Sequence, residues 1–134
     1  MKRHLILNRI KTPDGTILTS YHRHDYKLHT DTITGEDYMV DGGLDYERRS
    51  INKIPYIDLS VYSDDDYEIV RQSFHWKTYG KTGESPMRRV ILCEMSNDHL
   101  EAILMNRTYN TNPCRYLFEK ELAYREEHGI KIKD

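Results

Sequence analysis

The sequence contains little cysteine and no long hydrophobic run. Cys93 and Cys114 are its two cysteines, too few for a disulfide scaffold or a closed zinc site, so we expect buried thiols in a reducing compartment. The apolar part of the N-terminal segment KRHLILNRI is too short for the core of a signal peptide or for a transmembrane span. The expectation is a soluble protein of the cytoplasm that makes no contact with a membrane.

An excess of charge of one sign is also missing. The chain has 20 basic and 22 acidic residues and a formal net charge of −2, which argues against electrostatic attachment to DNA or to an anionic membrane. A nucleotide-like ligand would therefore be small and held in a pocket. Phenylalanine and tryptophan are scarce, but the eleven tyrosines offer flat contact area with one polar group each, although half-buried strand positions explain most of them.

The length and the pattern of the first half indicate one domain that begins with strands. A chain of 134 residues has the size of a single core, so residues 1–134 are expected to form one domain. Residues 4–10 and 16–24 have strand-like patterns, and TPDGT at 12–16 has the composition of a turn, which together predict a β-hairpin. The segment 31–43 predicts a second turn and a third short strand.

The second half of the chain carries helix signals. Ser63 predicts the start of a helix over residues 64–74, with three aspartates at its positive end. A second helix is expected to begin at Ser96. A third is expected over residues 112–128, with a proline at its first helical position and Gly129 after its end.

Between the first two helices, the sequence predicts a loop and then a strand. Residues 75–86, HWKTYGKTGESP, combine glycines and a proline with cationic and aromatic residues, and loops of this length are often functional. Residues 87–93, MRRVILC, are typical of a buried strand. The expected fold class is therefore α+β, a small antiparallel sheet of three or four strands packed against about three helices on one sheet face.

The segment YHRHDY at 21–26 raises the question of a metal site. If it is a strand, His22 and His24 lie on one face about 7 Å apart, close enough to share a metal. Asp41 or Asp45 would then add an oxygen ligand. Against this hypothesis, no further histidine or cysteine stands at a recognisable metal-binding spacing, and we expect no metal.

Acid–base chemistry is a second interpretation of the same segment. Asp25 and Asp41 could act as a general acid and base, or chelate magnesium for phosphodiester cleavage. A nucleophilic mechanism is less supported, because the sequence has no G-x-S-x-G motif. The structural alternative pairs Asp25 with Arg23 and lets Asp41 accept hydrogen bonds from the turn at Gly42 and Gly43.

The combination of arginines and aromatic residues favours a ligand pocket. Arginine is suited to forked recognition of phosphate, and aromatic faces are suited to stacking on a nucleobase. At Gly42 and Gly43, backbone N–H groups could approach an anion closely. Arginines or lysine and aromatic residues are interleaved in four segments: Arg48 and Arg49 after Tyr46; Phe74, Trp76, Tyr79 and Lys81; Arg107 and Tyr109; Arg115 and Tyr116.

Each of these residues also has a structural interpretation. Arg48 and Arg49 are equally typical of a solvated charge pair. Phe74 and Trp76 are equally typical of a core beneath a loop, and Arg107 of a cation that complements a helix end.

Five longer segments carry a resemblance to a known family: SYHRHDY, YMVDGGLDYERR, RQSFHWKTYGK, CEMSNDHLEAIL and ELAYREEHGIKI. Together they resemble small proteins encoded by phages and prophages, and in particular the first-described family of Thoeris anti-defence proteins. Members of that family are sponges that sequester cyclic ADP-ribose isomers made by a bacterial immune enzyme. The likeness spans nearly the whole chain.

The resemblance implies a homodimer or larger homo-oligomer in the host cytoplasm that binds a cyclic nucleotide without cleaving it. The implied ligand is a cyclic ADP-ribose isomer, with cyclic oligonucleotides as further candidates, held by an aromatic ring on adenine and by arginines on the pyrophosphate. Phe74 best matches the aromatic position. The candidate arginines are Arg48, Arg49, Arg107, Arg115 and Arg125. The remaining candidate ligand-binding residues are Trp76, Gly42, Gly43, His24 and Asp25.

Three functions from different classes are compatible with the sequence. The expected one is a non-enzymatic sponge, with no catalytic residues and no cofactor. The alternative is a metal-dependent phosphodiesterase that acts on a nucleotide signal through His22, His24, Asp25 and Asp41. The third is a phage protein that blocks a host protein by surface contact, favoured by the many tyrosines and the mixed-charge helices.

Overall fold

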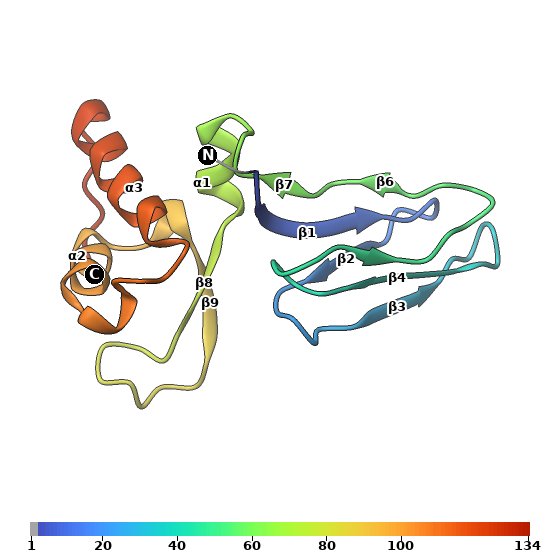
Figure 1. The fold of residues 1–134 in the computed structure, drawn as a ribbon, viewed down its shortest axis with the longest axis horizontal. Coiled ribbons are helices and arrows are strands. Elements are labelled where there is room, and N and C mark those ends of the chain that lie inside the picture. The colour runs from blue at the N-terminus through green and yellow to red at the C-terminus, as the bar shows by residue number, and fades with distance from the viewer. Residues whose placement is uncertain (1–2) are drawn as a thin grey trace. The chain divides into compact units, whose positions relative to one another are not determined.

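The computed structural model describes residues 3–134 of the chain. Within the expected single domain of residues 1–134, the contacts gather into two compact units, the N-terminal unit Met1–Phe74 and the C-terminal unit His75–Asp134. The described residues form antiparallel sheets and three α-helices, which confirms the expected α+β class (Figure 1). Of the helices in the described part, none is long and apolar enough to cross a membrane.

The first sheet of the N-terminal unit is built around β1. β1 pairs antiparallel with β2, and Asn8 lies opposite Ser20 while Lys11 lies opposite Ile17. This pairing confirms the hairpin expected around the turn at 12–16. Two further short strands also pair antiparallel with β1. The strands are β1 (Leu5–Lys11), β2 (Ile17–Ser20), β6 (Ile57–Asp58) and β7 (Val61–Tyr62).

The second sheet of this unit has β4 at its centre. Burial alternates at the start of β4, where Tyr38 and Val40 are fully buried and Asp37 is exposed, so one face of the sheet points into the core. Tyr38 and Val40 pack with Ile10 and Leu18 of the first sheet, so the two sheets share one core. The strands are β3 (Lys27–Thr30), β4 (Asp37–Asp41) and β5 (Arg48–Arg49).

Residues 21–26 form turns, so the expected extension of β2 through YHRHDY is wrong. The Asp25 carboxylate accepts a hydrogen bond from the Tyr21 N–H at 2.9 Å, and the Asp25 N–H donates to the His22 carbonyl. These local bonds compete with strand pairing. Asp25 pairs with Lys27 at 2.9 Å, and the expected partner Arg23 instead lies 4.0 Å from Asp45.

Helix α1 (Tyr67–Ser73) begins later than expected. Ser63 does not cap it, because the Ser63 hydroxyl accepts a hydrogen bond from the N–H of His4 at 2.9 Å. The Asp65 carboxylate accepts the N–H of Tyr62 at 2.9 Å. The Asp65 side chain therefore stabilises a turn that precedes the helix, and the Ser63 side chain ties this turn to His4.

The C-terminal unit begins with a two-stranded hairpin. The expected loop at 75–86 starts as strand β8 (His75–Thr78), which pairs antiparallel with β9 (Arg88–Ile91) and places Trp76 opposite Val90. The loop is therefore confined to the residues between these two strands. A short 3-10 helix (Leu92–Glu94) follows β9.

The two remaining α-helices pack against each other. Helix α2 (Asn97–Met105) begins after Ser96, whose hydroxyl accepts the N–H of His99 at 3.1 Å, and this confirms Ser96 as its cap. Helix α3 (Arg115–His128) ends at Gly129, which adopts a φ of 67° as expected for a helix C-cap. A further 3-10 helix (Arg107–Tyr109) lies between them.

Helix α3 begins three residues after the expected start. The Asn112 side chain accepts the N–H of Cys114 at 2.8 Å, which stabilises a turn before the helix instead of capping it.

Candidate ligand-binding site

The glycines predicted to receive an anion, Gly42 and Gly43, use their N–H groups inside the protein. Gly42 donates to the Asp41 carboxylate at 2.9 Å, and Gly43 donates to the Ser20 hydroxyl at 2.8 Å. Both glycines have positive φ values, 99° and 53°, a conformation that L-residues rarely adopt. The N–H groups of both glycines are therefore already bonded to the side chains of Asp41 and Ser20 and are not open to an external anion.

The YHRHDY loop lies directly against this glycine turn. A Cβ atom on Gly43 would lie 2.4 to 2.7 Å from backbone atoms of His22. The Ser20 hydroxyl, which accepts from Gly43, also donates to the Asp25 carbonyl at 2.7 Å. The two sequence motifs therefore pack on each other and brace one end of the N-terminal unit.

Arg49 is a buried structural residue. Its Nη2 donates to the Asn8 side chain at 2.8 Å, and its Nη1 lies 3.2 Å from Glu47 and 3.1 Å from Asp58. Asn8 in turn donates to the carbonyls of Asp41 and Gly43. The guanidinium thus holds the sheets and the glycine turn together.

Arg48 and His24 are the predicted ligand-binding residues of this unit that reach solvent. Arg48 is exposed, and its Nη1 lies 3.7 Å from the Asp41 carboxylate. His24 is exposed on the 21–26 loop, whereas Asp25 is half-buried. Among residues 3–134, no group of three or more His, Cys, Asp or Glu side chains is placed to hold a metal ion.

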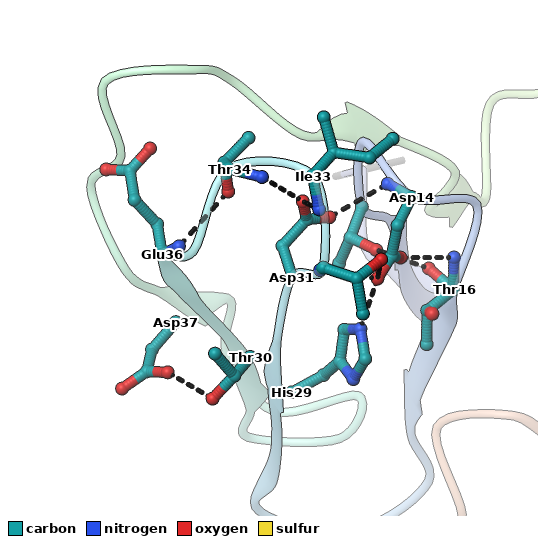
Figure 2. Close-up of polar contacts among 11 residues, drawn as sticks. Asp14, Thr16, His29, Thr30, Asp31, Ile33, Thr34, Glu36 and Asp37 are labelled. Atoms are coloured by element: carbon teal, nitrogen blue, oxygen red, sulfur yellow. Dashed lines mark hydrogen bonds and ion pairs between the residues drawn. The ribbon is translucent and has the colours of Figure 1, made fainter.

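The carboxylates of Asp14 and Asp31 join the turn between β1 and β2 to the turn between β3 and β4, as Figure 2 shows. Asp14 accepts hydrogen bonds from the Thr12 hydroxyl at 2.6 Å, the Thr32 N–H at 3.0 Å and the His29 ring at 2.8 Å. The Thr12 hydroxyl, the Thr32 N–H and His29 together lower the pKa of Asp14 far below its ordinary value. Asp31 accepts the N–H of Asp14 at 2.8 Å.

The Asp31 carboxylate also accepts bonds from its own turn. Burial alone would raise its pKa, but the N–H groups of Thr34, Asp14 and Ile33 outweigh this effect and leave the pKa lowered. The arrangement is a polar brace between two turns.

Acid should weaken this brace. Because the pKa values of Asp14 and Asp31 are lowered on folding, their stabilisation is complete above the unfolded-state pKa of about 3.9 and is lost as pH falls below it. We expect Asp14→Asn to destabilise the chain at pH 7 and to flatten the decline in stability between pH 5 and pH 2. Urea unfolding across this range measures both effects. Asp45→Asn, at an exposed aspartate, is the control, and an equal acid slope in both variants would contradict the prediction.

Two further predicted ligand residues are buried: Phe74, at the end of the N-terminal unit, and Arg125, in the C-terminal unit. Phe74, the expected stacking ring, is 1% exposed and has no open face for a base. Arg125 is also 1% exposed; its Nε donates to Glu121 at 2.7 Å, and its other nitrogens donate to the Asn97 side chain and the Leu92 carbonyl. Both residues serve the core.

The other two predicted arginines lie around the helices. Arg107 is exposed. Arg115 is half-buried, donates to the Leu104 carbonyl at 2.9 Å and lies 3.4 Å from Glu119. Neither lines the hollows described next.

Trp76 is the predicted residue that borders a hollow. Its ring lies edge to face against the rings of Tyr109 and Phe118, with centroid distances of 5.4 Å and 4.9 Å. This favourable aromatic geometry fixes the position of Trp76. The adjoining space, which we call the aromatic hollow, has a volume of about 440 Å³. Its walls include Trp76, Lys77, Tyr79, His99, Ile103 and Tyr109.

A second space, the charged hollow, adjoins the first. Its volume is about 650 Å³. The two hollows share Thr78, Gly80 and His99 in their walls. The charged residues that line the second hollow are Lys81, Arg88, Asp98 and Asp134.

The electrostatics of the charged hollow are set by one close ion pair. The Lys81 ammonium lies 2.9 Å from the Asp134 carboxylate. The Ser96 hydroxyl and Lys81 lower the pKa of Asp134, and Asp134 raises the pKa of Lys81. Burial lowers the pKa of His99, with Asp134 opposing that shift and Arg88 adding to it. His99 is therefore mainly neutral at pH 7.

Arg125 helps to hold one wall of the charged hollow in place through Asn97. It binds the Asn97 side chain, and Asn97 also accepts the N–H of Ile132 at 3.0 Å and donates its own N–H to the Ile132 carbonyl at 2.8 Å. The C-terminal segment is thereby tied to the start of α2, and Asp134 is held near Lys81.

Sequence reasoning did not assign His99, Arg88, Asp98 or Asp134 to a site. The cap at Ser96 was a readable signal, since it places Asp98 and His99 in the first turn of a helix. No local pattern shows that the 79–87 loop and the chain near residue 134 meet that turn.

Comparison with known proteins gives no relative. No family model, no curated protein and no solved structure matches this chain.

Proposed function

We propose that this protein binds a small cyclic nucleotide signal, such as a cyclic ADP-ribose isomer, and sequesters it without cleavage. The observation that carries the proposal is the pair of adjoining hollows around His99, one rich in aromatic side chains and the other containing Lys81 and Arg88. A nucleobase fits the chemistry of the first and a phosphate that of the second. The resemblance to Thoeris anti-defence sponges agrees with this proposal.

Sequestration makes simple physical demands on the site. Tight binding without turnover needs stacking and charge-assisted contacts in a preorganised pocket, and it needs no general base. Trp76 is held by two edge-to-face contacts, and Arg125 anchors the segment that carries Asp134. Both features reduce the ordering that binding would require.

The proposal includes a homodimer or larger homo-oligomer. Two exposed isoleucines support it, because Ile17 and Ile57 both lie opposite Lys11 on neighbouring strands and are 55% and 58% exposed. Lys11 is exposed between them, and exposed apolar side chains at such a place on a sheet are suited to association with a second copy.

Removing an aromatic side chain from the hollow should weaken binding. We expect Tyr79→Ala to reduce the affinity for cyclic ADP-ribose by roughly tenfold, because stacking on one ring contributes about 1–3 kcal/mol. Tyr79 is 46% exposed, so the variant should fold normally. Isothermal titration calorimetry measures the change.

The control is Tyr26→Ala, at a tyrosine that is 51% exposed in the N-terminal unit. It should bind like the unaltered protein. Recovery of intact ligand after denaturing the complex supports sequestration, whereas a linear product would favour the phosphodiesterase alternative. Equal affinities for both tyrosine variants would reject the aromatic hollow as the site.

A further inference from the structure

The Lys81–Asp134 ion pair lies in the wall of the charged hollow, where Lys81 is a cation that an anionic ligand could contact. Lys81 is 78% exposed and Asp134 35% exposed, so both side chains can rearrange. The Asp134 carboxylate lies 2.9 Å from the Lys81 ammonium, and both residues line the charged hollow. A carboxylate held by an ammonium occupies the position that a phosphate oxygen would take.

The charges of the hollow cancel while this pair is intact. Lys81 and Arg88 are balanced by Asp98 and Asp134, and burial favours the neutral form of His99. A hollow without net charge gives an anion little attraction. If Asp134 leaves, its walls gain one positive charge and Lys81 becomes available.

We infer that Lys81, with Arg88 in the walls of the same hollow, forms a phosphate-binding subsite that Asp134 occupies until an anionic ligand displaces it. This inference rests on the function proposed above and assigns the ligand's phosphate, or pyrophosphate, to the charged hollow. Asp134 then acts as an internal competitor that excludes weakly charged ligands. Its displacement requires no unfolding, because the bonds that tie the segment to α2 are made by Ile132 and Asn97.

Neutralising the competitor should strengthen anion binding. We expect Asp134→Asn to bind inorganic pyrophosphate roughly two- to fivefold more tightly than the unaltered chain, the fold-change that corresponds to losing an exposed ion pair. Lys81→Met should bind it roughly tenfold more weakly, since a charge-assisted contact is lost. Calorimetry on the full chain at low salt measures both, with cyclic ADP-ribose as a second probe.

Glu101→Gln is the matched control, because Glu101 is an exposed carboxylate on α2 outside the walls of the hollow. It should leave both affinities unchanged. The His99 ring provides a local readout by NMR: pyrophosphate in the subsite should raise the pKa of His99, and Asp134→Asn should lower it, because the carboxylate currently raises it.

The two probes separate this inference from the proposed function. Pyrophosphate affinities that follow the expected order without any binding of cyclic ADP-ribose would overturn the proposed function and leave the subsite standing. Cyclic ADP-ribose binding that Asp134→Asn does not strengthen would overturn the subsite alone. Failure of both the unaltered chain and Asp134→Asn to bind pyrophosphate, or binding that leaves His99 unshifted, would also overturn the subsite.

Discussion

Glu121→Ala should lower the free energy of unfolding of the C-terminal unit by about 3–5 kcal/mol, the cost of leaving one partner of a buried ion pair alone. Glu121 is fully buried, and its carboxylate lies 2.7 Å from Arg125 Nε. Arg125 would keep its bonds to Asn97 and Leu92 but would lose its only carboxylate partner within the described residues. Urea unfolding followed by circular dichroism measures the loss.

The helix offers a matched control in Glu119→Ala. Glu119 also pairs with an arginine four residues away, Arg115 at 3.4 Å, but its side chain is 59% exposed. Exposed pairs of this kind contribute about 1 kcal/mol or less. Equal losses in the two variants would show that burial of the Glu121–Arg125 pair contributes nothing special.

Glu121→Ala should also disturb the charged hollow. Arg125 holds Asn97, and Asn97 holds the segment that carries Asp134. A loosened guanidinium would therefore weaken the Lys81–Asp134 contact as well as the helix packing. The double variant Glu121→Leu with Arg125→Leu removes both charges and should recover much of the lost stability. It should not restore the Asn97 anchor.

Local signals in the sequence predicted several turns and helix ends, because short-range hydrogen bonds determine where these occur. TPDGT at 12–16 does form the first hairpin turn, Ser96 does cap α2, and Gly129 does end α3. At the turn and at Ser96, side chains bond to neighbouring backbone N–H groups, and at Gly129 the backbone N–H itself bonds to carbonyls of the last helical turn. Such contacts depend little on the rest of the chain.

The prediction failed where side chains had competing partners. Serine is a favourable residue type for a helix cap, but the Ser63 hydroxyl instead accepts a hydrogen bond from the N–H of His4, which is far away in the sequence. YHRHDY has the alternation of a strand, but the Asp25 carboxylate closes a turn on Tyr21. Tertiary and local hydrogen bonds outweighed propensity at both places.

The candidate site was only partly predictable for a related reason. Residue type alone cannot separate an arginine that holds phosphate from one that holds a buried carboxylate. For Arg125 the spacing contained the answer, since Glu121 stands four residues before it on the same helix face. For Lys81 and Asp134 no such signal exists, because hairpin and C-terminal segment meet through tertiary packing alone.

The N-terminal unit yields the second large effect, at the contact between the VDGG turn and the YHRHDY loop. Gly43 has a φ of 53°, and a Cβ atom there would lie within 2.4 Å of a His22 backbone atom. Backbone atoms cannot move aside as a flexible side chain can. The contact therefore admits glycine alone.

Gly43→Ala should destabilise the protein by about 3 kcal/mol or more, from the strain of a positive φ and from displacement of the loop. Gly35→Ala is the control, because Gly35 has a φ of 72° but no atom within 4 Å of its Cβ position. It should cost about 1 kcal/mol, from strain alone. Hydrogen exchange at the N–H groups of Asp25 and Gly43 reports the local change. Equal losses in the two variants would mean that the two motifs do not brace each other.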